Sequence, residues 1–346
     1  MLSVFSEVTN MKRHATMKVL VLDSAHAPLR LEQRPVPVPQ AGEVLVRLYA
    51  SGVNPLDLKI RAGAAPHAKH PFPAILGIDL AGVVEEVGKD VHGFVVGDEV
   101  MGMTGGVGGH QGSLAQFASV DARLLAPKSA RLTMRQAAAI PLAFITAWEG
   151  LVDRARIRDG QHVLVHGGAG GVGHMALQIA SSFGAKTFAT VSAANAEYVA
   201  GLGAVSIDYR TTPLDRYVAE HTHGEGFDIV YDTVGGHVLD ASFKAVKRFG
   251  HVVSALGWGT HALAPLSFKA GTYSGVFTLL PLLTGVGREH HGEILRQATR
   301  LADAGALIPR LDSQLYTLET ANEAHAAVAA STATPGKVVI TINEER

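Results

Sequence analysis

Three glycines, Gly168, Gly170 and Gly173, follow an apolar run from Val163 to Val165. Their spacing is that of a dinucleotide fingerprint. One glycine forms the turn, the next admits a pyrophosphate, and the third lets a helix pack closely on the strand. From Val172 to Phe183 apolar residues recur at the spacing of one buried helix face, and the free N–H groups that begin such a helix bind phosphate. The pattern predicts a dinucleotide site, with a purely structural glycine turn as the alternative.

The type of nucleotide can be judged roughly 20 residues further on, where an acidic residue accepts the ribose 2′-hydroxyl of NAD. The segment from Ala189 to Asn195 contains no carboxylate, so it would not repel a 2′-phosphate. Ser192, Asn195 and the later Tyr209 and Arg210 offer hydrogen-bond donors instead. The sequence favours NADPH, and NADH stays open because no Lys or Arg stands in the segment itself.

The elements around this turn alternate between strand and helix after Gly160. Strands are predicted at 163–166, 187–191, 206–209, 228–232, 251–256 and 273–278. Such alternation predicts a doubly wound parallel sheet of the Rossmann type. The candidate cofactor-binding residues on this sheet are Gly168, Gly170, Gly171, Val172, Gly173, Ser192, Asn195, Tyr209, Thr233 and Leu256.

The remainder of the chain is rich in β-strand patterns punctuated by glycine. Segments 17–23, 43–49, 75–88 and 91–103 are of this kind, and 337–342 is a final strand that we expect to return to them. The predicted fold is α/β, with the Rossmann domain inserted in a barrel-like, GroES-like substrate domain. The expected boundaries are a flexible tail at 1–16, the β-rich domain at 17–139 and 280–346, and the dinucleotide-binding domain at 140–279.

Composition excludes several kinds of protein. The 346 residues carry a formal net charge of −1, which gives no global attraction for nucleic acid or an anionic membrane. No apolar run reaches the roughly 18 residues of a membrane span. The start of the chain lacks the apolar core of a secretory signal, so we expect a cytoplasmic protein. The chain has no cysteine, which removes disulfides and cysteine-ligated zinc sites.

The order of motifs resembles the medium-chain dehydrogenase/reductase superfamily, and within it the zinc-free quinone and enone oxidoreductases. The resemblance runs from about Met17 to Ile342 and rests on stretches 52–57, 76–84, 97–100, 112–116, 168–173, 232–236 and 336–339. Zinc-dependent relatives bind catalytic zinc with two cysteines and a histidine. The resemblance places Ile78 at that histidine's position, so it implies chemistry without a metal.

The resemblance also implies which residues flank the reacting atoms. It places Asn54 beside the nicotinamide and substrate, and Thr146 against the nicotinamide. In plant-type enone reductases a lysine matching Lys59 can reach a carbonyl oxygen. Each has a structural alternative: Asn54 can cap the helix that Pro55 begins, Thr146 can bond to its own helix backbone, and Lys59 can be a solvated surface lysine.

The function implied is a metal-free, NADPH-dependent transfer of hydride to quinones or α,β-unsaturated carbonyls. A nucleotide-binding sensor or structural protein without turnover and a zinc-free alcohol dehydrogenase are the alternatives. A tyrosine that some relatives carry after Arg-x-Gly is replaced here by Ala64, so its role cannot be transferred. The apolar run Val276–Leu283 is too apolar for a bare sheet edge, and the resemblance implies a homodimer formed there.

Overall fold

The computed structural model describes residues 16–330 and 336–344. Most of the predicted tail, residues 1–15, lies outside the described residues. Thr16 does not belong to it, because Thr16 already pairs with Pro35 where strand β1 (Thr16–Val21) runs antiparallel to β2 (Arg30–Pro35). Met17, Val19 and Val21 are buried, and this alternation carries the strand one residue into the predicted tail.

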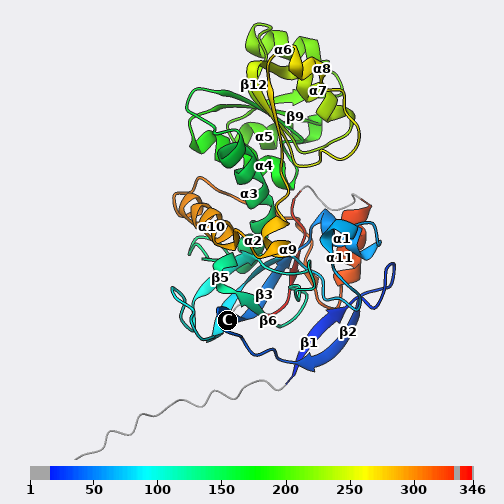
Figure 1. Ribbon diagram of the computed structural model, residues 1–346, viewed down its shortest axis with the longest axis vertical. Coiled ribbons are helices and arrows are strands. Elements are labelled where there is room, and N and C mark those ends of the chain that lie inside the picture. Colours follow the sequence, from blue (N-terminus) through cyan, green and yellow to red (C-terminus); the bar gives the residue numbers. More distant parts are fainter. Residues whose placement is uncertain (1–15, 331–335, 345–346) are drawn as a thin grey trace, which may run out of the picture.

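The lower half of the molecule in Figure 1 is built on a mainly antiparallel sheet. Its strand order is β14-β15-β3-β4-β5-β7, with β6 also paired to β3. The strands are β3 (Glu43–Gly52), β4 (Asp79–Val87), β5 (Glu99–Met103), β6 (Phe117–Asp121), β7 (Leu125–Pro127), β14 (Tyr316–Thr317) and β15 (Val339–Thr341). Since β15 pairs antiparallel with β3, the last strand returns to the first sheet, as the sequence predicted.

The upper half holds a six-stranded parallel sheet with the order β10-β9-β8-β11-β12-β13. Its strands are β8 (His162–His166), β9 (Lys186–Val191), β10 (Val205–Asp208), β11 (Phe227–Asp232), β12 (Val246–Ser254) and β13 (Thr272–Gly275). Its helices are α4 (Gly171–Ser182), α5 (Ala196–Gly201), α6 (Leu214–Thr222), α7 (His237–Ala245) and α8 (Ala264–Ser267). This is the doubly wound order that the alternating pattern predicted, with its switch point beside β8.

One strand prediction was wrong. Strand β13 ends at Gly275 and does not continue to Thr278. The apolar run that follows turns into helix α9 (Leu280–Thr284), and Leu279 and Leu282 are buried inside the same chain. Its hydrophobicity therefore serves intramolecular packing, and it no longer argues for a partner strand.

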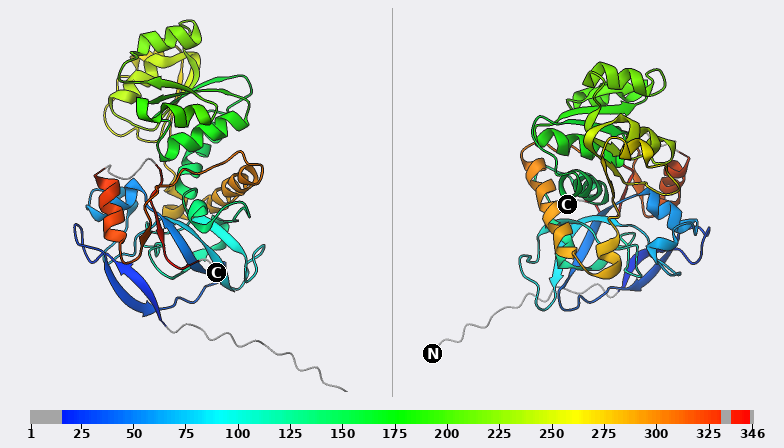
Figure 2. Two further views of the ribbon diagram at one scale, coloured as in Figure 1. Left: turned by 180° about the vertical axis from the view of Figure 1, so that it is seen from behind. Right: turned by 45° about the horizontal axis from the view of Figure 1, so that its top comes forward.

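The two sheets are joined by helices that lie between them (Figures 1 and 2). Here α2 (Met134–Ala138) and α3 (Pro141–Trp148) are separate helices, and a π-helix continues over Glu149–Arg154. Helix α3 packs against both α4 and α10 (Arg288–Asp303). Beside the antiparallel sheet lie α1 (Pro55–Arg61) and α11 (Ala321–Ala329), which contact each other.

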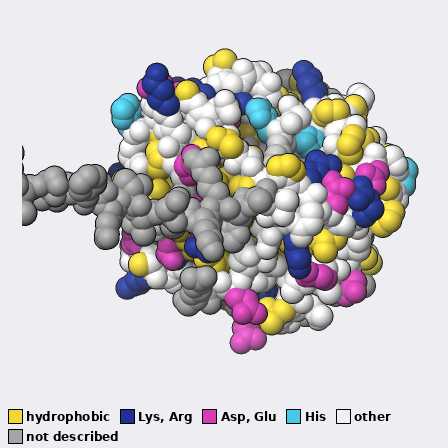
Figure 3. Space-filling model, turned by 90° about the horizontal axis from the view of Figure 1, so that it is seen from below, with side chains coloured by type: hydrophobic (Ala, Val, Ile, Leu, Met, Phe, Trp, Pro, Cys, Tyr) yellow, Lys and Arg dark blue, Asp and Glu magenta, His cyan; other side chains and the backbone are white. Residues whose placement is uncertain are grey.

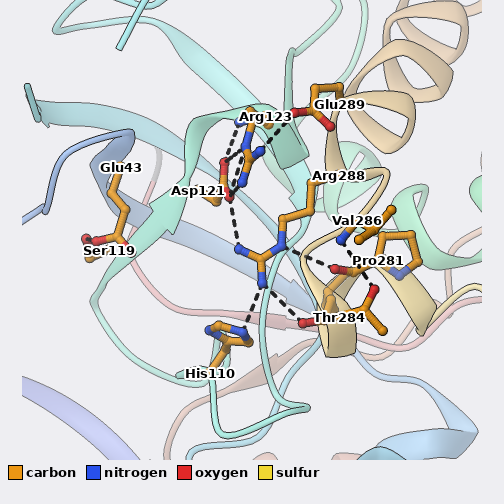
Figure 4. Close-up of polar contacts among 11 residues, drawn as sticks. Glu43, His110, Ser119, Asp121, Arg123, Pro281, Thr284, Val286, Arg288 and Glu289 are labelled. Carbon is orange, nitrogen blue, oxygen red and sulfur yellow. Dashed lines mark hydrogen bonds and ion pairs between the residues drawn. The ribbon is translucent and has the colours of Figure 1, made fainter. Parts of the chain in front are cut away.

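The Arg288 side chain ties several of these elements together (Figure 4). Its guanidinium donates to the backbone oxygens of Pro281 and Leu282, to the carboxylate of Asp121 at 2.9 Å, and lies 3.1 Å from Nε2 of His110. The glycine-rich loop that carries His110 is thus anchored to the corner between α9 and α10.

Surface charge shows no separation by sign on the face drawn in Figure 3. Lys and Arg side chains lie among Asp and Glu there, in keeping with a formal net charge of −1. No helix among the described residues is both long and apolar enough to cross a bilayer.

Candidate functional site

The glycine turn between β8 and α4 has the close packing that its spacing requires. A side-chain carbon on Gly173 would lie 2.2 Å from the backbone oxygen of Gly167, and one on Gly168 would lie 2.4 Å from Cβ of Ala189. These two glycines therefore let the helix and strands approach. A side-chain carbon on Gly171, at the start of α4, would meet nothing within 4 Å, so the helix N-terminus faces open space.

That open space is a cavity of about 1050 Å³. Ligand sites commonly span about 300–1,000 Å³, so the cavity has room for a dinucleotide. Six residues predicted to bind cofactor line it: Gly170, Gly171, Ser192, Asn195, Tyr209 and Thr233. The other four, Gly168, Val172, Gly173 and Leu256, are not among its lining residues. The packing role of Gly168 and Gly173 explains why a fingerprint residue need not touch the nucleotide.

Hydrogen bonds fix the turn after β11, which brings Thr233 to the cavity. The Asp232 carboxylate accepts hydrogen bonds from the N–H groups of Val234 and Gly235 and, at 2.7 Å, from the hydroxyl of Ser254. The Thr233 hydroxyl donates to the backbone oxygen of His166 at 2.6 Å. The turn after β11 is therefore fixed against the end of β8.

Two buried histidines line the same cavity. His166 Nδ1 lies 3.0 Å from the Thr190 hydroxyl, and His174 Nδ1 donates to the backbone oxygen of Gly170 at 2.9 Å. Burial lowers the pKa of His166 to about 4 and, despite an opposing hydrogen bond to Gly170, that of His174 to about 4. Both rings are therefore neutral at physiological pH and act as fixed hydrogen-bonding groups.

Lys337 also lines the cavity, although the sequence did not predict it as a site residue. Its ammonium contacts Oδ1 of Asn54 and lies 3.3 Å from Oδ2 of Asp79. The Asn54 side chain in turn donates to Asp79 at 2.9 Å. Side chains of all three are at least nine-tenths buried, so a buried ion pair holds the Asn54 amide in place.

The register of the last strand explains why Lys337 reaches Asn54. Val339 pairs with Gly52, and the N–H of Val53 donates to the oxygen of Val338. Continuing this antiparallel register by one more residue sets Lys337 opposite Asn54. The sequence did indicate Lys337, because stretch 336–339 carries part of the family resemblance and its strand was predicted to return to the first domain.

Asp57 lies directly beneath this group. Its carboxylate accepts hydrogen bonds from the N–H of Asn54 at 2.8 Å and from that of Gly77 at 3.2 Å. Burial raises the pKa of Asp57 to about 7, and burial also raises the pKa of Asp79 although Lys337 opposes the shift. The backbone N–H of Asn54 is therefore capped by Asp57, while its side-chain amide bonds to Asp79 and Lys337.

Thr146 lies where α3 meets the segment after β13. Its hydroxyl donates to the backbone oxygen of Leu142 at 2.7 Å and lies 3.1 Å from the hydroxyl of Thr278. Tyr231 donates to the backbone oxygen of Thr146 at 2.6 Å. The bond to Leu142 is the structural alternative given for this residue. The contact with Thr278 additionally places it at the junction between the two halves of the chain.

Lys59 lies apart from these groups, on the exposed side of α1, whereas Asn54 precedes the same helix and is buried. The structure thus joins Asn54 to Lys337 and Thr146 to Thr278, and it does not join Lys59 to either pair. The roles of Asn54, Lys59 and Thr146 stay predictions.

An aromatic cluster bridges the two halves near this junction. The ring of His67 stacks on Trp258 with centroids 5.3 Å apart, and the Phe277 ring meets each of them edge-on, at 6.1 and 6.2 Å. His67 comes from the loop after α1, Trp258 from the loop after β12, and Phe277 precedes Thr278.

The donor set does not suit a catalytic zinc ion. The sequence has no cysteine, and Ile78 stands where the resemblance expects a histidine ligand. The carboxylate of Asp79 is already paired with the ammonium of Lys337, a cation that would repel a metal. Within residues 16–330 and 336–344, no three His, Asp or Glu side chains come together as a metal site.

A parallel sheet, a glycine turn that opens on a cavity large enough for a dinucleotide, and a second, mainly antiparallel sheet define a dinucleotide-binding protein of the two-domain dehydrogenase class. Two family models match the chain. One describes the alcohol dehydrogenase GroES-like domain and covers residues 40–130, and the other describes a zinc-binding dehydrogenase and covers residues 202–340.

Individual proteins extend the match. A solved structure of an alcohol dehydrogenase superfamily protein from Novosphingobium aromaticivorans is 58% identical, with a TM-score of 0.93 over 95% of this chain and 100% of that one. A 2-methylene-furan-3-one reductase of Solanum lycopersicum is 35% identical over 90% of this chain and 75% of its own length. A chloroplastic NADPH-dependent alkenal/one oxidoreductase of Arabidopsis thaliana is 34% identical over 80% of this chain and 66% of its own length.

Other relatives are far longer than this chain. It matches the spectinabilin polyketide synthase system protein NorB of Streptomyces orinoci at 34% identity over 78% of this chain but only 12% of that protein. Taken with the two family models, these matches show that the chain belongs to the medium-chain dehydrogenase/reductase superfamily, in its quinone and enone oxidoreductase branch.

Proposed function

We propose that this protein reduces α,β-unsaturated carbonyls or quinones with NADPH. The observation that carries the proposal is that one cavity is lined both by Gly170 and Gly171 of the glycine turn and by Lys337, whose ammonium contacts the buried Asn54 amide. The names of the enone-reducing relatives support the same reaction and the same cofactor.

Bound NADPH supplies a hydride, and the protein must hold the cofactor and the acceptor against each other. In this proposal Gly170 and Gly171 present the N-terminus of α4 to the pyrophosphate. Asn54 and Thr146 flank the nicotinamide, and Lys59 is the candidate for contact with the acceptor carbonyl. Lys337 is a positioning residue, since its ammonium orients the Asn54 side chain.

We propose further that the reaction needs no metal. An enone or a quinone is already polarised, so placement and a few fixed dipoles can suffice where an unactivated alcohol would need a Lewis acid. The absence of cysteine and the pairing of Asp79 with Lys337 support this proposal. The aromatic cluster of His67, Trp258 and Phe277 would favour flat, conjugated acceptors, because such molecules can stack against it.

Stopped-flow absorbance of NADPH with a panel of enones, quinones and simple alcohols tests the proposal. We expect NADPH to be consumed with enones or quinones, equally fast after treatment with a chelator. Loss of activity on chelation would overturn the metal-free scheme. Tight NADPH binding with no acceptor reduced would favour the sensor or structural role, and NADP reduction by alcohols would favour an alcohol dehydrogenase.

We also propose a homodimer, formed by pairing of β13 with its copy. β13 is the outermost strand of the parallel sheet and three of its four residues are exposed, so it is free to add a further strand. Sedimentation at micromolar concentration should give twice the mass of the chain, and a monomer would contradict the proposal. A cytoplasmic location stays a prediction from the sequence, to be tested by fractionation.

A further inference from the structure

An arginine from a distant part of the chain stands at the ribose side of the nucleotide cavity. Arg310 lines the cavity together with Ser192, Asn195 and Tyr209. Its Nη1 donates to Oδ1 of Asn195 at 3.1 Å, across 115 residues of sequence. We propose that Arg310 recognises the 2′-phosphate of NADPH and sets the preference for NADPH over NADH, an inference that rests on the proposed use of this cofactor.

The location argues for the 2′-phosphate and against the pyrophosphate. The end of the strand after the first crossover helix, here β9, is where a dehydrogenase reads the ribose, and Ser192 and Asn195 directly follow it. The pyrophosphate is expected at the N-terminus of α4 instead. The segment after β9 has no carboxylate that would accept a 2′-hydroxyl or neutralise the Arg310 guanidinium. The positive charge of Arg310 beside Asn195 can therefore bind a phosphate.

The side chain of Arg310 is held in a defined orientation. Its guanidinium carbon lies 3.9 Å from the centre of the Tyr198 ring, a cation–π contact that complements the bond to Asn195. A guanidinium has five N–H donors in a planar fork that suits two phosphate oxygens at once, and Asn195 uses one donor. Among residues 16–330 and 336–344 its guanidinium has no second hydrogen-bond acceptor, so further donors can bind a ligand in the cavity that Arg310 lines.

The backbone around Arg310 is fixed to the phosphate-binding helix. Gln178 of α4 accepts from the N–H of Ile308 at 2.7 Å and donates to its oxygen at 3.3 Å. The N–H of Arg310 points to Nε2 of His174 at 3.5 Å, and the other ring nitrogen of His174 donates to Gly170. The oxygen of Arg310 accepts from the N–H of Lys337. Helix α4 thus positions both its own N-terminus, where the pyrophosphate is expected, and the backbone of Arg310.

Arg210 is the competing candidate, because it follows Tyr209 and lies over its ring at 5.7 Å. It is exposed and is not among the residues that line the cavity, whereas Arg310 is partly buried and lines it. A direct comparison of the two arginines therefore decides between them.

The test is a fluorescence titration of the full-length protein with NADPH and with NADH, for Arg310→Gln and for the matched control Arg210→Gln. Loss of a charged hydrogen bond predicts that Arg310→Gln weakens NADPH binding about 10- to 100-fold and NADH binding less than about threefold. Arg210→Gln should leave the ratio of the two affinities unchanged. Equal weakening of both cofactors by Arg310→Gln, or collapse of the ratio in Arg210→Gln alone, would overturn the proposal.

A second variant guards against misfolding of the first. Asn195→Asp places a carboxylate at the atom that Arg310 already contacts, so it should engage the arginine, repel a 2′-phosphate and move the preference towards NADH. An unchanged preference in a folded Asn195→Asp protein would contradict the proposal. Since binding needs no turnover, a wild type that prefers NADPH but reduces no acceptor would refute the proposed function and leave this inference standing. A wild type without preference would refute the inference alone.

Discussion

Replacing Lys337 by methionine tests how the site is held together. The variant keeps the length of the side chain and removes the ammonium, which leaves the fully buried Asp79 carboxylate with two donors, the Asn54 amide and the Leu142 N–H. Breaking a buried ion pair on one side costs about 3–5 kcal/mol. We expect that loss in the free energy of unfolding at neutral pH, measured by urea denaturation, while the exposed Lys89→Met control changes it by less than about 0.5 kcal/mol.

The double variant Lys337→Met/Asp79→Asn separates the ion pair from loss of packing. Removing both charges together should cost less than the sum of the two single changes, because neither partner is left charged and buried. The cost of Lys337→Met should also shrink in mild acid, because burial already raises the pKa of Asp79 and a protonated carboxyl needs no counter-ion. A loss below about 1 kcal/mol in Lys337→Met, or strict additivity in the double variant, would refute this reasoning.

Three further predictions concern the glycine turn, the two buried histidines and Thr146. Gly173→Ala places a carbon 2.2 Å from a backbone oxygen, so it should lower the free energy of unfolding by about 1–3 kcal/mol and weaken NADPH binding. The control Gly201→Ala, whose added carbon meets nothing within 4 Å, should be neutral or slightly stabilising. Equal effects of the two variants in urea unfolding would contradict this prediction. His166 and His174 have pKa values of about 4 in the folded protein, below the unfolded value of 6.5. The stability that these neutral histidines contribute is therefore complete above pH 6.5 and is lost as the pH falls to about 4. Unfolding free energies that stay constant over this pH range would contradict the prediction. Thr146→Val should lower kcat for enone reduction by about tenfold or more if this hydroxyl flanks the nicotinamide, and unchanged steady-state kinetics would remove Thr146 from the site.

Local patterns in the sequence were sufficient for the architecture of the nucleotide site. The glycine spacing at 168–173 predicted a strand, a turn and a helix, and the structure has β8 and α4 around that turn. Alternation of strands and helices predicted the parallel sheet. These features depend on residues close together in the chain.

The site residues that the sequence did not predict, Lys337 and Arg310, are far in sequence from the residues that they contact. Lys337 reaches Asn54 only through the register of β15 on β3, and Arg310 reaches Asn195 only because α4 holds its backbone. An apolar run, 276–283, was wrongly predicted to form a strand at a sheet edge. Its composition is the same whether it forms an edge strand or a turn and a helix packed inside the chain. Composition predicts that such a segment is buried, but only tertiary packing determines which other residues cover it.

The most direct measurement of the central claim follows a deuterium label. NADPH that carries deuterium at both C4 positions of the nicotinamide is mixed with this protein and an α,β-unsaturated ketone, and the product is analysed by mass spectrometry and NMR. We expect one deuterium per product molecule, at the carbon β to the carbonyl, in chelator-treated protein as in untreated protein. A product without deuterium at that carbon, or no product while NADPH stays bound, would contradict it.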